Sequence, residues 1–280
     1  MPPRARVRVL CDNEALPGFA AEWGLCLHIE AGGSRLLWDA GRTGVFLDNA
    51  ARLGLDLAGL DAAALSHGHY DHGDGFPLLR ARAGFSGPVH AHPGHAVERF
   101  AREDDGSLEP VGLAAGARDA LAGFVPVDGV AELLPGLAML AAIPRRPGLT
   151  PAADGLFLDP AGTVPDPLPD DACLVLDAAP GPVLVLGCCH AGLANTLHQV
   201  RDALGFRRLA AVAGGLHLYS AGPAALAEAR DALREFGSPR LFPGHCTGRK
   251  ATDWLAREFP GRVEPLAAGR QHVAHRPAAD

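Results

Sequence analysis

Three histidines and one aspartate stand within six consecutive residues of this chain, and this cluster restricts its fold and chemistry more than any other feature. Residues 67–72 read His-Gly-His-Tyr-Asp-His. Imidazole and carboxylate groups are the ligands that zinc, manganese and iron accept in proteins. The preceding residues 61–66 are apolar up to the cluster, as expected for a short buried strand that leads into a loop. The segment therefore predicts one half of a metal site at the end of a strand.

Length, charge and cysteine usage restrict the class of partner. The chain has 280 residues and a formal net charge of −7, without a basic run. We therefore expect a small-molecule substrate and no nucleic acid as the main partner. Neither a span of ~18 apolar residues nor an apolar N-terminus of signal-peptide length is present, so we expect no membrane partner. The six cysteines form no C-x-x-C pair, which favours free thiols in a reducing cytoplasm. The oligomeric state stays open.

Hydrophobic periodicity predicts hairpins in the first half of the chain and alternating strands and helices in the second half. The strands expected in the first half are 7–10, 25–29, 34–39, 61–66 and 88–92, with helices at 45–54 and 76–84. The strands expected in the second half are 172–177, 183–186, 209–213 and 240–242, with helices at 192–204 and 223–236. This order indicates a layered α/β protein with mixed sheets.

One zone breaks this regularity. Residues 102–170 are rich in glycine, proline and aspartate, and only 133–143 within them has the pattern of a strand. We interpret the zone as an irregular, pocket-shaping insertion within a single domain that spans residues 1–280.

Three further histidines follow an apolar strand and a glycine, and they can complete the metal site. The strand at 183–186 continues through Gly187 to His190, the strand at 209–213 through two glycines to His217, and the strand at 240–242 through Gly244 to His245. In layered α/β folds, the strand ends along one edge of the sheets converge on a common crevice. We therefore expect these histidines near residues 67–72.

Each of these histidines also has a simpler interpretation, because a lone histidine is more often a hydrogen-bonded structural residue than a ligand. The cluster at 67–72 needs partners, which favours His190 and His245 as ligands. His217 is left open between a ligand, a group that supports a ligand and a group that faces the substrate. Cys188 and Cys189 precede His190 and are expected to be buried thiols, with metal contact as the alternative.

Asp71 carries the most chemical interest in the cluster. Its carboxylate can bind a second metal or accept a proton from metal-bound water, whose pKa a metal lowers from 15.7 to about 7. Asp39 ends the strand at 34–39, and we hold two interpretations of it equally: a residue that supports the metal ligands, or an ordinary turn aspartate.

These motifs resemble a known family. Residues 67–72 match the H-x-H-x-D-H signature of the metallo-β-lactamase superfamily, residues 36–41 resemble its first aspartate motif, and residues 242–245 resemble its last histidine motif. Further segments around Asn13, Cys188 and Gly215 resemble the subfamily of dihydropterin-ribofuranosylaminobenzene-5′-phosphate synthase and its bacterial relatives. The resemblance implies a four-layer αβ/βα sandwich with its metal site at one edge, and it gives metal roles to His67, His69, Asp71, His72 and His245.

Two departures from the family pattern concern the other ligands. The separate histidine expected before residue 172 has no counterpart, since residues 150–171 contain no histidine. The bridging aspartate expected after 183–186 is replaced by Gly187-Cys-Cys-His190, and we assign His190 to its place. The predicted ligands are thus His67, His69, Asp71, His72, His190 and His245. They would bind one or two divalent ions, with zinc first and iron or manganese as alternatives.

Three functions are compatible with these residues. The first is a metal-dependent hydrolase, in which a metal-bound hydroxide attacks an ester, lactone, amide or phosphate and Asp71 is the catalytic residue. The second is a condensing enzyme like the dihydropterin-ribofuranosylaminobenzene-5′-phosphate synthase, whose anionic substrates would need cations such as Arg145-Arg146 or Arg249-Lys250, or the helix beginning near Gly192. The third is a non-hydrolytic metal-binding protein or a diiron redox module.

Overall fold

Two β-sheets packed face to face form the centre of the molecule. The computed structural model describes residues 5–151 and 155–273. The spatial order of strands in the first sheet is β16 (Gln271–Val273), β1 (Arg6–Cys11), β2 (Cys26–Ala31), β3 (Ser34–Trp38), β4 (Ala62–Ala64), β5 (Val89–Ala91) and β8 (Val125–Pro126). β2 and β3 form the predicted antiparallel hairpin, whereas β3, β4, β5 and β8 run parallel.

The second sheet collects strands from the later half of the chain. Its spatial order is β15 (Arg240–Gly244), β14 (Ala211–Gly215), β13 (Val183–Leu186), β12 (Cys173–Leu176), β10 (Leu137–Leu140) and β9 (Val130–Leu134). β12 and β13 form the antiparallel hairpin expected from their apolar runs. β13, β14 and β15 are parallel neighbours, so their carboxyl ends lie at the same edge of the sheet.

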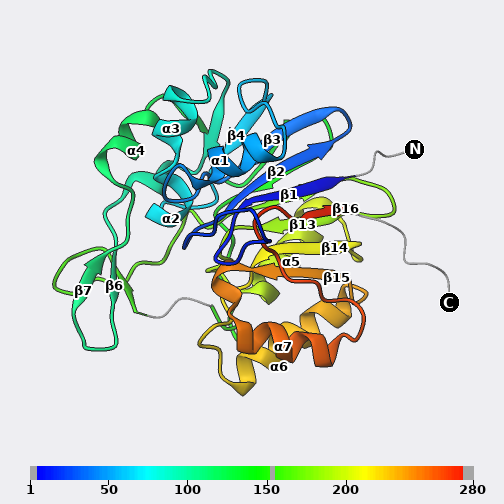
Figure 1. Cartoon of the computed structure of the whole chain (residues 1–280). Coiled ribbons are helices and arrows are strands. Elements are labelled where there is room, and N and C mark those ends of the chain that lie inside the picture. Colours follow the sequence, from blue (N-terminus) through cyan, green and yellow to red (C-terminus); the bar gives the residue numbers. More distant parts are fainter. Residues whose placement is uncertain (1–4, 152–154, 274–280) are drawn as a thin grey trace.

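Helices cover the outer face of each sheet and complete four layers, which confirms the predicted αβ/βα sandwich (Figure 1). The first sheet packs against α1 (Val45–Arg52), α3 (Phe76–Ala81) and α4 (Ala115–Ala120). The second sheet packs against α5 (Leu193–Leu204), α6 (Pro223–Glu235) and α7 (Arg249–Glu258). Within residues 5–151 and 155–273, no helix has the length and hydrophobicity needed to cross a membrane.

The core between the sheets follows directly from period-two alternation. In β3, Leu36 and Trp38 point toward the second sheet, while Leu37 points toward the helices of the first sheet. In the second sheet, Leu174 and Val185 meet them from the other side. Each fully buried side chain of this kind contributes about 1.5–3 kcal/mol, so the two sheets are held firmly in one relative position. This matters for function because the site lies across both sheets.

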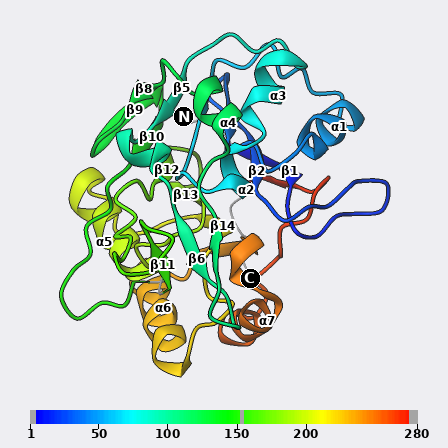
Figure 2. The ribbon, with the colours of Figure 1, turned by 90° about the vertical axis from the view of Figure 1, so that its left-hand side faces the viewer.

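The zone predicted as an irregular insertion contributes to both sheets. The predicted strand at 133–143 is confirmed as part of β9 and β10, and β8 extends the first sheet. A small third sheet, in the order β11 (Leu156–Phe157), β6 (Phe100–Arg102) and β7 (Leu108–Pro110), lies on the side of the molecule that Figure 2 presents. The strands β6, β7, β8 and β11 have only two or three residues, too few to give a periodic signal in the sequence. Residues 152–154 of this zone lie outside the described residues.

Candidate metal centre

The strand ends of both sheets meet at one edge, as the strand–glycine–histidine pattern predicts. β4 leads to His67, β13 to His190, β14 to His217 and β15 to His245. Gly187 at the end of β13 lies so close to the first sheet that an added Cβ would collide with the Ser66 hydroxyl. This close approach needs glycine, and it brings residues from both sheets into contact.

Three imidazoles form one compact set, which we call the three-histidine group: His67, His69 and His190. The Nε2 atom of His67 lies 2.9 Å from Nδ1 of His69 and 3.1 Å from Nε2 of His190. All three side chains are buried. The backbone bends between the first two at Gly68, where an added Cβ would collide with the carbonyl oxygen of His95.

Asp71, His72 and His245 form a second set, which we call the carboxylate group. The short helix α2 (Tyr70–Gly73) carries the first two. The Nε2 atom of His245 lies 3.2 Å from Nε2 of His72 and 3.3 Å from the Oδ2 atom of Asp71. The structure thus brings together all six residues that the sequence nominated, in two groups of three potential metal ligands.

The two groups touch each other, and His217 lies beside them. The ring centroids of His67 and His72 are 4.3 Å apart, and those of His190 and His217 are 4.4 Å apart. His217 has a positive φ of 48°, a backbone conformation that non-glycine residues adopt rarely and mainly at constrained positions.

Asp39 supports a histidine of each group. Its Oδ2 atom accepts hydrogen bonds from Nδ1 of His72 at 2.7 Å and from the Ser66 hydroxyl at 2.8 Å. The Ser66 oxygen in turn lies 2.9 Å from Nδ1 of His67, so it accepts the proton of that nitrogen. A carboxylate only accepts, and this arrangement therefore leaves the lone pairs of both Nε2 atoms facing the site. Of the two interpretations held for Asp39, the geometry favours support of the histidines.

His245 is oriented in the same way from another segment. Its Nδ1 atom lies 3.1 Å from the Oδ1 atom of Asn13, and its backbone N–H donates to Asp12 at 2.8 Å. The Asn13 oxygen also accepts from the backbone of Gly24, which fixes it as the acceptor. Asn13 belongs to a segment that the sequence singled out only by resemblance.

An ion-pair network that sequence reasoning missed holds the two histidine loops in place. Asp170 accepts from the backbone N–H of Gly68, and Asp171 accepts from that of Ala191, each at 2.7 Å. Arg99 is fully buried and pairs with Asp170 at 2.6 Å and with Asp166 at 2.7 Å. Removing one partner of such a pair costs about 3–5 kcal/mol because a buried charge is left uncompensated. Three aspartates just before an apolar strand are the only signal of this network in the sequence.

The electrostatics of the two groups differ. Burial lowers the pKa of His69 to about 3 and depresses the pKa values of His67 and His190, and the neighbouring imidazoles add to the effect. In the carboxylate group, burial raises the pKa of Asp71, but His72 and His245 outweigh it and keep the carboxyl ionised. Burial lowers the pKa of His245, but the hydrogen bond with Asp71 and the negative charges of Cys246, Asp71 and Asp12 together outweigh this and raise the value to about 9.

These features fit a divalent cation. In the three-histidine group, Nδ1 of His69 and Nε2 of His190 lie 2.9 and 3.1 Å from Nε2 of His67, so three ring nitrogens converge on one position, an arrangement that a shared cation stabilises. The other ring nitrogens of two of these histidines, Nε2 of His69 and Nδ1 of His190, are buried and have no hydrogen-bond partner among the described residues. Because these nitrogens do not face the other imidazoles, the position of a shared cation follows from Nδ1 of His69 and from Nε2 of His67 and His190.

Cys188 also lies among these ligand atoms. Its Sγ atom is 3.1 Å from Nε2 of His72. Cys189 turns the other way, with its Sγ atom 3.4 Å from the Thr196 hydroxyl, and joins the core under α5. The family pattern placed the missing bridging ligand at this point of the chain, and the sequence interpretation assigned that place to His190. The structure instead places His190 with His67 and His69, and puts the Cys188 sulfur beside His72.

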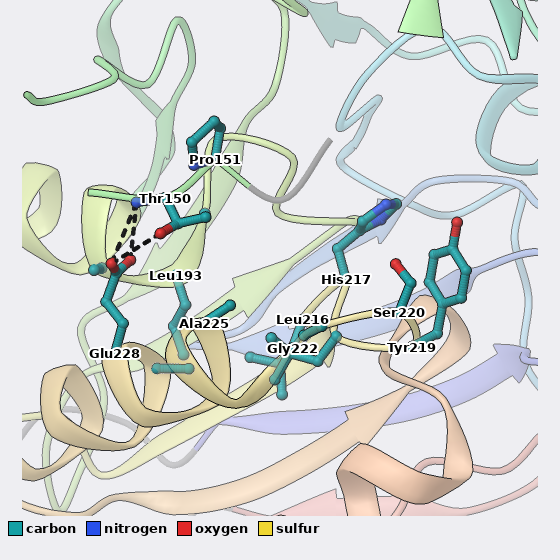
Figure 3. A pocket seen from close by; sticks show the side chains of 15 residues that line it. Thr150, Pro151, Leu193, Leu216, His217, Tyr219, Ser220, Gly222, Ala225 and Glu228 are labelled. Atoms are coloured by element: carbon teal, nitrogen blue, oxygen red, sulfur yellow. Dashed lines mark hydrogen bonds between the residues drawn. The ribbon is translucent and has the colours of Figure 1, made fainter. Parts of the chain in front are cut away.

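Two cavities open beside the histidines. One, of about 570 Å³, is lined by His245, Asn13, Trp23, Tyr219 and Arg249, among others. The Trp23 and Tyr219 side chains there are 51% and 59% exposed. The other, of about 210 Å³, lies next to His217 and is lined by Thr150, Leu193 and Glu228, among others. Figure 3 shows that His217, Ser220 and Tyr219 lie side by side on the segment after β14.

The fold and the site place this protein in the class of α/β sandwiches that carry a cluster of imidazoles and a carboxylate, a candidate metal centre, at one edge of the sheets. Residues 24–245 match the model of the metallo-beta-lactamase superfamily, and the chain belongs to this superfamily.

Individual relatives agree with this assignment. The chain is 28% identical over 255 residues to the 7,8-dihydropterin-6-methyl-4-(beta-D-ribofuranosyl)-aminobenzene-5′-phosphate synthase of Methanocaldococcus jannaschii. The aligned residues cover 87% of this chain and 86% of the relative. It is 27% identical over 256 residues to an uncharacterised protein of the same organism, with 90% of this chain and 94% of the relative covered. Its structure is similar to that of Tm1679, described as a metal-dependent hydrolase of the beta-lactamase superfamily. The TM-score is 0.79 at 28% identity, over 96% of this chain and 98% of the other.

Proposed function

We propose that the protein is a metal-dependent enzyme that hydrolyses a small molecule in the cavity beside His245. The observation that carries this proposal is the juxtaposition of two ligand groups, three-histidine and carboxylate, at one sheet edge. The similarity to a structure described as a metal-dependent hydrolase supports it.

The ligands we propose are the six residues of the two groups. Their nitrogen and oxygen atoms suit zinc first, with iron or manganese as alternatives. A divalent ion bound there would lower the pKa of a coordinated water from 15.7 to about 7 and polarise an oxygen of the substrate.

Residues around the ligands orient the histidines, and Asp71 is the candidate for proton transfer. Asp39 and Asn13 keep the outer nitrogens of His72 and His245 protonated, so that the inner nitrogens face the site. Asp71 is ionised and lies 3.3 Å from Nε2 of His245. We assign to its carboxylate the role of accepting a hydrogen bond, and with it the proton, from the attacking water, because Asp71 is the carboxylate of the two ligand groups.

The substrate we propose is a small molecule with a flat or apolar part and an anionic group. Trp23 and Tyr219 expose aromatic surface to the cavity, and the ring centroid of Trp23 lies 5.4 Å from that of His245. Arg249 lines the same cavity at the start of α7. Among the other cations that the sequence nominated, Arg146 pairs with Asp202 at 2.9 Å, away from this cavity.

Metal analysis together with a substrate survey tests this function. We expect one to two divalent ions per chain, loss of activity on chelation and recovery with zinc. Generic esters, lactones and phosphodiesters should be turned over by the loaded protein. A preparation from metal-replete medium that contains no metal would contradict the proposal. Bound iron with a visible spectrum and no hydrolysis would favour a redox module instead.

A synthase-like condensation is the second candidate, favoured by the 28% identity over 255 residues to the archaeal synthase. The exposed aromatic surface of Trp23 and Tyr219 and the cation Arg249 suit an aromatic phosphate such as the one in the name of that relative. Incubation of the metal-loaded protein with a dihydropterin donor and a ribofuranosylaminobenzene 5′-phosphate distinguishes the two candidates. Formation of the joined product favours the synthase, whereas release of the hydrolysed donor alone favours the hydrolase.

A further inference from the structure

The Cys188 sulfur lies between the two ligand groups. Its side chain is buried, at 3% exposure, and its Sγ atom forms one potential ligand set with His67 and His72, one residue from each group. In this set the ligand atoms lie within 4.8 Å of one another. The same limit holds for the sets that Cys188 forms with His190 and His217, and with His245 and Cys246.

The backbone explains why this cysteine, and not its neighbour, reaches the centre. Gly187 packs directly against Ser66 of the first sheet, so the residue that follows it enters the gap between the sheets. Cys189 has a positive φ of 63°, and its side chain turns back toward Thr196. Among the sets of potential ligands found in the described part of the chain, none contains Cys189.

We propose that the Cys188 sulfur is a metal ligand shared between the three-histidine group and the carboxylate group. The inference rests on the proposed metal centre and adds a soft ligand to it. When a metal binds, the Cys188 thiol releases its proton to solvent and the sulfur coordinates as a thiolate. The contact of 3.1 Å with Nε2 of His72 shows that the sulfur already stands beside a nitrogen whose lone pair faces the site.

A sulfur ligand changes which metals the centre prefers. Thiolate and imidazole together favour zinc, iron and cobalt, whereas magnesium and manganese prefer carboxylate, carbonyl and water oxygens. The expected order of affinity therefore places zinc and cobalt well ahead of manganese.

Cobalt substitution tests the proposal directly. The metal-free wild-type protein, Cys188→Ser and the matched control Cys189→Ser are each loaded with Co²⁺, and their absorption spectra are recorded. We expect a near-ultraviolet sulfur-to-cobalt charge-transfer band in the wild type and in Cys189→Ser. Cys188→Ser should lose this band but keep the visible cobalt bands, since histidine ligands are left. Its zinc affinity should fall at least about 10-fold, the lower range for changes around a metal site.

The possible failures are distinguishable. If the wild type binds no Co²⁺, the metal centre itself is refuted. If it shows visible cobalt bands without a charge-transfer band, only the sulfur ligand is refuted. A band that persists in Cys188→Ser and disappears in Cys246→Ser would assign the ligand to Cys246 and overturn the proposal. Should Cys188→Ser fail to fold, X-ray absorption of the zinc-loaded wild type decides, because a thiolate gives a sulfur neighbour at about 2.3 Å.

Discussion

The two ligand groups lie in contact, but their buried titratable side chains differ in charge. In the three-histidine group, His67, His69 and His190 are neutral because burial depresses their pKa values. In the carboxylate group, Asp71 and His245 form a buried ion pair, with Oδ2 of Asp71 3.3 Å from Nε2 of the protonated His245. The three-histidine group thus consists of uncharged imidazoles. The carboxylate group already contains a negative charge, on Asp71, which the protonated His245 balances.

The three-histidine group therefore depends more on a metal ion than the carboxylate group does. The three-histidine group gains a positive charge and a partner for its nitrogens only when a cation binds. In the carboxylate group, a metal has to replace the proton that His245 holds. Asp39 connects the groups because it orients His72 directly and His67 through Ser66. Substitutions in either group, and a change of pH, test this difference.

Asp71→Asn should remove catalysis while leaving the three-histidine group intact. Loss of a proton acceptor typically lowers the rate by 10²–10⁴-fold, so we expect a decrease of about that size in kcat. Metal content and circular dichroism show whether the fold and the other group survive. Unchanged turnover would remove Asp71 from the mechanism and with it the functional difference between the groups.

His190→Ala should lower metal content by disrupting the three-histidine group, since two imidazoles are left there. His28→Ala is the matched control, because His28 is also buried but lies in β2 away from the site. His217→Ala resolves the alternative left open by the sequence: metal loss in this variant would make His217 a ligand. Metal content that does not fall in His190→Ala would place His190 outside the set of ligands.

Asp39→Asn should weaken metal binding in both groups, because one carboxylate orients a histidine of each. Changes to residues that support ligands typically cost 10–100-fold in metal affinity, and we expect a loss in this range. Asp61→Asn is the control, since Asp61 accepts a backbone hydrogen bond from Arg35 on the same sheet but is remote from the site. A competition titration with a metal chelator measures both variants. A loss confined to one group would show that the groups are supported independently.

The metal-free protein should lose stability at both ends of the pH range, through a different group at each end. The folded-state pKa of His69, about 3, lies below the ordinary value of 6.5, so its contribution is present above pH 6.5 and is lost as the pH falls toward 3. The folded-state pKa of His245 is raised to about 9, so its contribution is present below pH 6.5 and is lost as the pH rises through 9. Each histidine contributes a slope of up to about 1.4 kcal/mol per pH unit.

Urea unfolding of the metal-free protein at several pH values measures these slopes. His69→Gln should flatten only the acid side, and His245→Gln only the alkaline side. If both variants changed the same side, the electrostatic distinction between the groups would be wrong.

The sequence predicted most of the scaffold because its signals are local. Alternation in 25–29 and 34–39 indicated the β2–β3 hairpin, and the apolar runs at 172–177 and 183–186 indicated β12 and β13. The strands β6, β7, β8 and β11 were not predicted, since two or three residues carry no period and form strands only through pairing. Helix α7 and strand β16 were missed as well.

The cluster at 67–72 and the three strand–glycine–histidine segments are features of the chain itself, and they indicated by themselves which residues would meet. Tertiary structure decided how they are grouped: His190 joins His67 and His69, Cys188 enters between the groups, and Asp39 supports both. These relations join residues from different sheets, and Cys188 and His72 are 116 positions apart. Their distances depend on how closely Gly187 packs against Ser66, a property of the two packed sheets that no local pattern encodes.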